Sequence, residues 1–155
     1  MEGSVATTAV VLGARVRVAA RDWKAAVRAA AAPLLEAQAI TGGYVDRCLA
    51  LVEQNGPYIV VAPGIALAHA RPEDGAVALA LSAATLTEPV RFGHPTNDPV
   101  DIVLAFASPD RDAHVGLLAA LARHLTQGLD QQLRTARSEA AAVARLQEVV
   151  DDVDQ

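Results

Sequence analysis

Residues 56–72 read GPYIVVAPGIALAHARP, an apolar run that leads into a histidine. Within it, Tyr58–Ala62 is continuously apolar and bounded by turn residues, which is typical of a buried strand. Pro63 and Gly64 then predict a loop that contains His69. A loop at the end of a strand is where α/β sheets usually bind ligands, and a neutral imidazole can act there as a nucleophile or general base. The alternative is a turn histidine held by backbone hydrogen bonds.

The segments before this stretch predict one strand and two helices. Alternating polar and apolar residues favour a strand over Val10–Val18. An aspartate cap and one apolar face predict a helix over Trp23–Ala39, which Pro33 should kink or divide. Thr41 is expected to cap a second helix over Tyr44–Gln54.

The segments after it predict further strands and then only helices. Strands are expected over Val77–Ala84 and Val90–Phe92, separated by a turn near Pro89, and over Asp101–Ala107 after a polar loop. The expected helices are Asp112–Leu125, Leu129–Ala136 and Ser138–Val150. This order predicts an α/β fold, a mixed sheet flanked by helices in a three-layer sandwich. With no linker or repeat, we expect one domain over residues 1–155 with a core of about 10–150.

The composition excludes several classes of function. The 18 acidic against 13 basic residues give a net charge of −5, without the basic stripe that nucleic acid requires. The single cysteine, Cys48, cannot form an internal disulfide, and no apolar run is long enough to span a membrane. Val5–Leu12 is mildly apolar but lacks the preceding cationic region of a secretory signal. We therefore expect a cytoplasmic protein with no direct membrane insertion.

The remaining histidines offer one further candidate. His114 lies in the first turn of a predicted helix, where free N–H groups favour anions, although a solvent-facing role is the alternative. His94, in a polar loop flanked by prolines, is expected to be a surface residue, and His124 is expected to be structural or exposed. No two histidines have the spacing of a helical zinc motif, so we expect neither a metal site nor a cofactor. Arg71, two residues after His69, could pair with a bound anion.

The segment around His69 resembles a known family. Residues 56–67 and 69–75 are similar to the signature of enzyme IIA components of the bacterial phosphoenolpyruvate:sugar phosphotransferase system, in the mannitol/fructose superfamily and nearest to its ascorbate-type branch. Weaker similarities occur in the same order along residues 20–148, among them Asp22-Trp23-Lys24, Asn97-Asp98-Pro99 and the late His114. The resemblance implies a mixed sheet flanked by helices.

The resemblance also implies a function. It makes His69 the phosphoacceptor, through Nε2, and puts His114 beside it in one pocket, stabilising the phosphoryl group. The implied partners are the phosphocarrier HPr, an enzyme IIB domain and a membrane enzyme IIC, with sugar uptake, ascorbate-like by branch, as the outcome. A phosphorylation-dependent regulatory module of the same fold is the alternative, and the chain could act as a monomer or a homodimer.

Two positions depart from the family pattern. Ala68 precedes the active histidine where proline is usual, and Leu51 stands where mannitol-type relatives carry a helix arginine. Arg71 is therefore the candidate cationic partner of the phosphoryl group, by its position alone.

Overall fold

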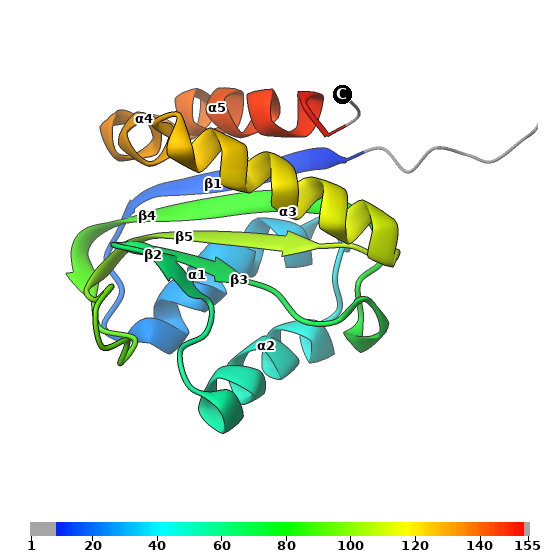
Figure 1. The fold of residues 1–155 in the computed structure, drawn as a ribbon, viewed down its shortest axis with the longest axis horizontal. Coiled ribbons are helices and arrows are strands. Elements are labelled where there is room, and N and C mark those ends of the chain that lie inside the picture. Colours follow the sequence, from blue (N-terminus) through cyan, green and yellow to red (C-terminus); the bar gives the residue numbers. More distant parts are fainter. Residues whose placement is uncertain (1–8, 154–155) are drawn as a thin grey trace, which may run out of the picture.

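The computed structural model describes residues 9–153, which form one five-stranded sheet with helices on both faces (Figure 1). The strands are β1 (Val10–Val18), β2 (Val60–Ala62), β3 (Ile65–Ala68), β4 (Ala80–Val90) and β5 (Val100–Ala107). The helices are α1 (Trp23–Glu36), α2 (Gly42–Asn55), α3 (Arg111–Thr126), α4 (Leu129–Thr135) and α5 (Glu139–Asp151), with a short 3-10 turn, η1 (Pro72–Asp74).

The sheet is mixed, as the sequence predicts. Its strand order is β1-β4-β5-β3-β2. Two pairs of neighbouring strands are parallel, β1 with β4 and β3 with β5. The other two pairs are antiparallel, β4 with β5 and β2 with β3. The predicted α/β fold with helices on both faces is therefore confirmed.

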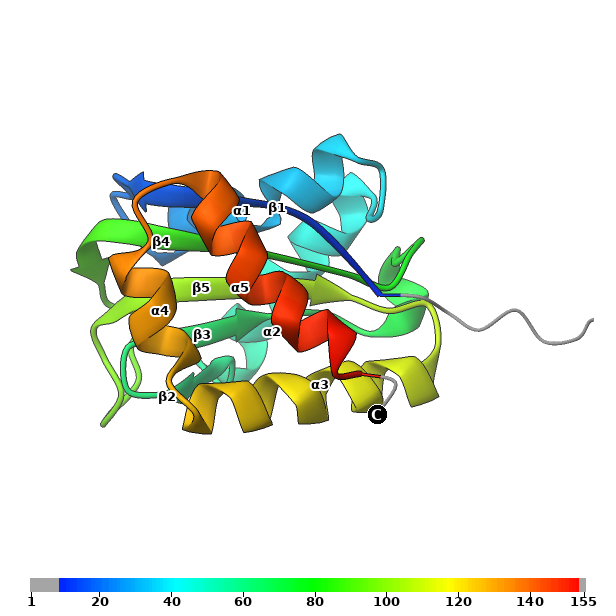
Figure 2. The ribbon, with the colours of Figure 1, turned by 90° about the horizontal axis from the view of Figure 1, so that it is seen from above.

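Two apolar cores lie on the two faces of the sheet. Helices α1 and α2 cover one face and α3, α4 and α5 the other, with α5 crossing above the outer strand β1 (Figure 2). Side chains alternate along β5, so that Ile102, Leu104 and Phe106 join the core under α3 and α5. Their neighbours on the opposite face, Val103 and Ala105, join the core under α1. The face of α1 in this core carries the small side chains of Ala26, Ala30 and Ala31.

The loop predicted to carry His69 is in part a strand. The apolar run after Tyr58 contributes only the three-residue edge strand β2. The chain then turns at Gly64, whose φ of +79° suits glycine, and enters β3, a fully buried strand that pairs with β5. His69 directly follows β3. The prediction missed this strand because Pro63 and Gly64 end one strand without preventing the next.

The predicted turn near Pro89 is also wrong. β4 continues from Ala80 to Val90 as one strand, and its pairing register with β5 shifts between Thr85 and Val90. The residues 87–89 within this irregular stretch are exposed. A proline lacks the N–H that a regular ladder needs, and a bulged stretch tolerates this loss.

Pro33 does not divide the first helix. It lies inside α1, which continues to Glu36 and then ends, short of the predicted Ala39. The ring of Pro33 packs against β1 at Gly13. A Cβ added at Gly13 would lie only 2.9 Å from the Cβ of Pro33. The proline thus packs the last turn of the helix against the sheet, and the helix loses the one hydrogen bond that an N–H at this position would donate to the carbonyl of Ala29.

None of the helices within residues 9–153 is long and apolar enough to cross a membrane. Residues 5–8 of the apolar segment Val5–Leu12 lie outside the described part of the chain.

Candidate functional site

Two histidines meet at one edge of the sheet. His69 follows β3, and His114 lies in the first turns of α3, which follows β5. Because β3 and β5 are parallel neighbours, their carboxyl ends lie at the same edge. The two imidazole rings are 5.7 Å apart between centroids, at an interplanar angle of 62°. The predicted placement of His114 next to His69 is therefore confirmed.

The buried ring of Phe106 supports both imidazoles. It is fully buried at the end of β5, with its centroid 5.2 Å from that of His69 in a stacked arrangement and 4.8 Å from that of His114. The half-exposed ring of Tyr58 meets His69 edge-on at 6.0 Å. Aromatic pairs of this kind contribute more stabilisation than their buried surface area alone would give, and they favour particular ring orientations. His69 is thus held in one plane, with part of its edge open to solvent.

A backbone hydrogen bond determines the tautomer of His69. Its Nδ1 lies 3.0 Å from the carbonyl oxygen of Leu67. A carbonyl can only accept, so Nδ1 carries the proton and donates it. In the neutral ring, Nε2 is then unprotonated and has a free lone pair. This is the nitrogen that the family resemblance implies as the phosphoacceptor.

Burial keeps both imidazoles neutral near pH 7. Desolvation lowers the pKa of His69, and the hydrogen bond to Leu67 offsets this in part. Desolvation also lowers the pKa of His114, with a further decrease from repulsion by the neighbouring His69. Nε2 of His69 is therefore available as a nucleophile at neutral pH.

The Tyr44 hydroxyl ties the histidine segment to the sheet. On the buried face of α2, it donates to the carbonyl oxygen of Phe106 at 2.9 Å and accepts from the N–H of Ala70 at 3.0 Å. Burial raises the pKa of this phenol, so it stays protonated. The sequence predicted Tyr44 only as the first residue of the second helix. A tyrosine on the apolar face of a helix signals a buried hydroxyl, but its partners are far away in sequence.

The histidines open into a pocket of about 480 Å³. Its walls come from α2, the turn between α2 and β2, the segment after β3 and the start of α3. The lining residues are Leu51, Asn55, Tyr58, His69, Ala70, Arg71, Pro72, Arg111, His114 and Val115. No carboxylate among residues 9–153 lines it, although the chain is acidic overall. The pocket therefore favours an anion.

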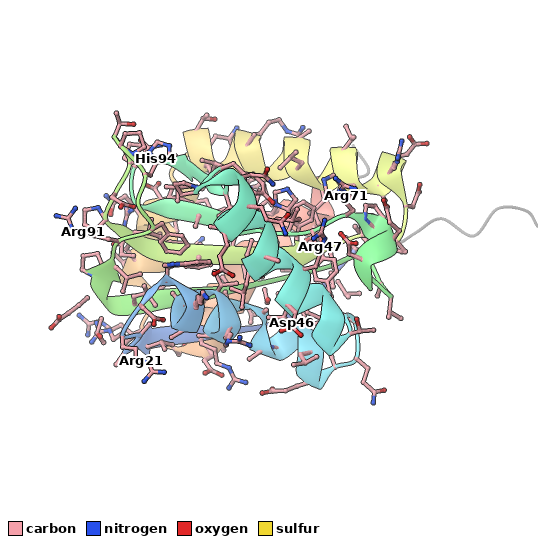
Figure 3. The ribbon with its side chains drawn as sticks, turned by 90° about the horizontal axis from the view of Figure 1, so that it is seen from below. Arg21, Asp46, Arg47, Arg71, Arg91 and His94 are labelled. Atoms are coloured by element: carbon pink, nitrogen blue, oxygen red, sulfur yellow. The ribbon has the colours of Figure 1, made fainter. Side chains whose placement is uncertain are left out.

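Arg71 is held at the rim of this pocket through its backbone. Its N–H donates to the Asp74 carboxylate at 3.0 Å, and the same carboxylate lies 3.9 Å from Nε of Arg47 on α2. Figure 3 shows Arg71 and Arg47 close together at the end of the sheet opposite to His94. Arg47 is thus engaged by Asp74, whereas the exposed guanidinium of Arg71 forms no ion pair within residues 9–153.

The other two histidines have structural roles, which the sequence predicted as one alternative for His124 and did not predict for the half-buried His94. Nδ1 of His94 accepts the N–H groups of Thr96 and Asn97 and so holds the loop before β5. His124 pairs through Nε2 with the carboxylate of Asp152 and joins α3 to the end of α5. Neither lines the histidine pocket. Within the described residues, no three His, Cys, Asp or Glu side chains are arranged to hold a metal ion.

A neutral imidazole nitrogen in an anion-favouring pocket can attack an anionic electrophile. Residues 14–149 match the family described as "Phosphoenolpyruvate-dependent sugar phosphotransferase system, EIIA 2". The chain belongs to this family. EIIA components are phosphotransferases, so the chain is a phosphotransferase.

Relatives of known structure or name support the assignment. The "Ascorbate-specific PTS system EIIA component" of Escherichia coli K12 is 36% identical over 143 residues, which are 91% of this chain and 88% of that protein. The mannitol-specific cryptic enzyme IIA of Escherichia coli is 28% identical with a TM-score of 0.72, over 95% of this chain and 93% of that one. Enzyme IIA from the complex of the mannitol IIA and phosphorylated IIB proteins has a TM-score of 0.72 at 19% identity, over 89% and 93% of the two chains, and shares the fold.

Replacing Tyr44 with phenylalanine tests the hydroxyl bridge. Tyr44→Phe leaves the Ala70 N–H and the Phe106 carbonyl without their partner in a buried place. An unsatisfied buried group costs about 1–3 kcal/mol. We expect the free energy of unfolding, measured with urea, to fall by about that amount. Tyr58→Phe, at a half-exposed ring, is the control and should change it little. Equal stability of Tyr44→Phe and the wild type would contradict the role of the hydroxyl.

An NMR titration of the histidine rings tests the electrostatics of the pocket. In the wild type, the pKa values of His69 and His114 should both lie below the ordinary 6.5. His69→Ala should raise the pKa of His114, because it removes the repulsion and opens the pocket to water. As the pH falls through the pKa of His69, Nε2 gains a proton and phosphoryl acceptance should decrease. In the control, His94→Ala, the pKa of His114 should equal that of the wild type. An unchanged His114 pKa in His69→Ala would contradict the electrostatic coupling of the two histidines.

Proposed function

We propose that this protein is a cytoplasmic phosphocarrier that accepts a phosphoryl group from HPr on Nε2 of His69 and passes it to an enzyme IIB component. Residues 10–150 act as its single folded unit. The observation that carries the proposal is the tautomer of His69. With its proton on Nδ1 and donated to Leu67, the ring presents an unprotonated Nε2 beside His114.

The transfer needs no group beyond the two proteins. The lone pair of Nε2 of His69 forms a bond to phosphorus, while the P–N bond of the donor phosphohistidine breaks and its electron pair returns to the donor imidazole. A donor ring protonated on its other nitrogen leaves as neutral imidazole, and the His69 ring takes over the positive charge. The Leu67 carbonyl, already bound to Nδ1–H, stabilises that charge. Phosphoryl transfer of this kind depends mainly on positioning and charge stabilisation.

His114 and Arg71 are the proposed partners of the transferred group. The phosphoryl group brings about two negative charges at neutral pH. A His114 ring 5.7 Å from that of His69 can donate a hydrogen bond to a phosphoryl oxygen on Nε2. Arg71 supplies a permanent positive charge in the same pocket, and a guanidinium fork suits phosphate oxygens.

The substrate class follows from the named relatives. We propose that the system takes up an ascorbate-like sugar acid, since the Escherichia coli relative at 36% identity is named ascorbate-specific. Enzyme IIB, and through it a membrane enzyme IIC, are the proposed onward partners, as in the mannitol IIA and IIB complex of a structural neighbour. The name of that ascorbate relative favours a transport role over a regulatory one. Rapid transfer from the phosphorylated protein to a IIB domain would distinguish the two.

Phosphorylation in a reconstituted system tests the role of His69. With phosphoenolpyruvate, enzyme I and HPr, the protein should gain one phosphoryl group, as seen by intact-mass spectrometry. The adduct should be labile in acid and stable in base, as expected for a phosphoramidate. His69→Ala should gain none, because the nucleophile is absent, whereas His94→Ala should react like the wild type. A phosphorylated His69→Ala protein would overturn the assignment.

The rate of this reaction in a second variant tests His114. His114→Ala should still be phosphorylated on His69, but about 100-fold more slowly, the typical cost of removing one donor that stabilises developing charge. Rapid-quench measurements with phosphorylated HPr give the rate. His124→Ala, on the same helix but outside the pocket, is the matched control. Equal rates for His114→Ala and the wild type would remove His114 from the mechanism.

A further inference from the structure

We propose that Arg111 is a second guanidinium contact of the phosphoryl group on His69. This inference rests on the proposed function and adds a residue that lies far from His69 in the sequence. Arg111 is the first residue of α3 and lines the histidine pocket. His114 follows three residues later and lines the same pocket. Residues three apart share one face of a helix, so α3 turns both side chains toward the place of the phosphoryl group.

A bound phosphoryl group needs more positive charge in the pocket than the two histidines can supply. Both imidazoles are held near neutrality at pH 7, whereas the phosphoryl group carries about two negative charges. Among the residues that line the pocket, only Arg71 and Arg111 are permanently charged, and both are positive. Leu51, on the α2 wall, contributes an apolar surface. Two guanidinium groups therefore match the charge of one phosphoryl group.

The Arg111 side chain is also free to take this role. Several other arginines of the chain are engaged by carboxylates: Arg15 with Glu36, Arg134 with Asp101 and Asp130, Arg145 with Glu148, and Arg47 with Asp74. Within residues 9–153, the exposed guanidinium of Arg111 forms no such pair. The neighbouring Asp110 is occupied as the helix cap, where its carboxylate accepts the N–H of Asp112.

Arg71 and Arg111 reach the pocket from two different elements. Arg71 comes from the segment between β3 and η1, and Arg111 from the start of α3. The parallel pairing of β3 and β5 brings these segments together in the same way as it does the two histidines. We infer that the two guanidinium groups bind separate phosphoryl oxygens, while His69 holds the phosphorus through Nε2.

The test separates contact with the phosphoryl group from attraction of a protein partner. Phosphoramidate, a small chemical donor, is used beside phosphorylated HPr. Arg111→Gln should slow phosphorylation of His69 by phosphoramidate about tenfold or more, because a charge-assisted hydrogen bond is lost. With HPr, the loss should appear in kcat. Arg111→Lys keeps the positive charge but loses the planar guanidinium fork, so its phosphorylation rate should lie between those of Arg111→Gln and the wild type.

The matched control is Arg123→Gln, which removes the same charge from the same helix. Arg123 is exposed, donates to the Asp152 carbonyl and does not line the pocket, so its rates should equal those of the wild type. Equal rates for Arg111→Gln and the wild type would overturn the inference. A change in KM for HPr with an unchanged phosphoramidate rate would also overturn it, because it would make Arg111 a docking residue. A wild-type protein that takes no phosphoryl group on His69 from HPr would instead disprove the proposed function.

Discussion

The parallel pairing of β3 with β5 is the constraint on which the site depends. Residues 65–68 pair in register with residues 102–105, so both strands end at one edge of the sheet. His69 leaves one strand there, and Phe106 lies at the end of the other, beneath both imidazoles. A slip of one residue would turn every side chain of β3 to the opposite face. The two apolar cores prevent this, because Ile65 and Leu67 fill one and Ala66 and Ala68 the other.

The site combines two neutral imidazoles with two arginine side chains. Burial against Phe106 favours the neutral form of both histidines, and the Leu67 carbonyl selects the tautomer with a free Nε2. A protonated imidazole at this place could not attack, so the positive charge that a phosphoryl group needs has to come from other side chains. Arginine suits this purpose because its charge does not depend on pH in the physiological range.

The departures from the family pattern have a local physical explanation. Leu51 lines the pocket with an apolar side chain. The positively charged side chains of the pocket, Arg71 and Arg111, come instead from the segment after β3 and from the start of α3. Ala68, where relatives usually carry proline, lies within β3 and pairs with Ala105 of β5. The sheet thereby restrains the backbone before His69, and the Tyr44 hydroxyl restrains the Ala70 N–H immediately after it. The segment is held on both sides without the stiffness of a proline ring.

The amino-acid sequence by itself determined the order of most elements, the α/β class and the two histidines worth pursuing, because periodicity, caps and motifs are local properties. It did not reveal β3, since Pro63 and Gly64 end one strand and precede another within three residues. It also missed the continuity of β4 through Pro89, which depends on a bulge against its neighbour. Only the tertiary structure decided the partners of Tyr44 and the tautomer of His69. It likewise decided that Arg71 and Arg111 line one pocket. The partners of Tyr44 and the meeting of the two arginines require segments distant in sequence to come together at one sheet edge, whereas the bond of His69 to Leu67 depends on the backbone conformation at the end of β3.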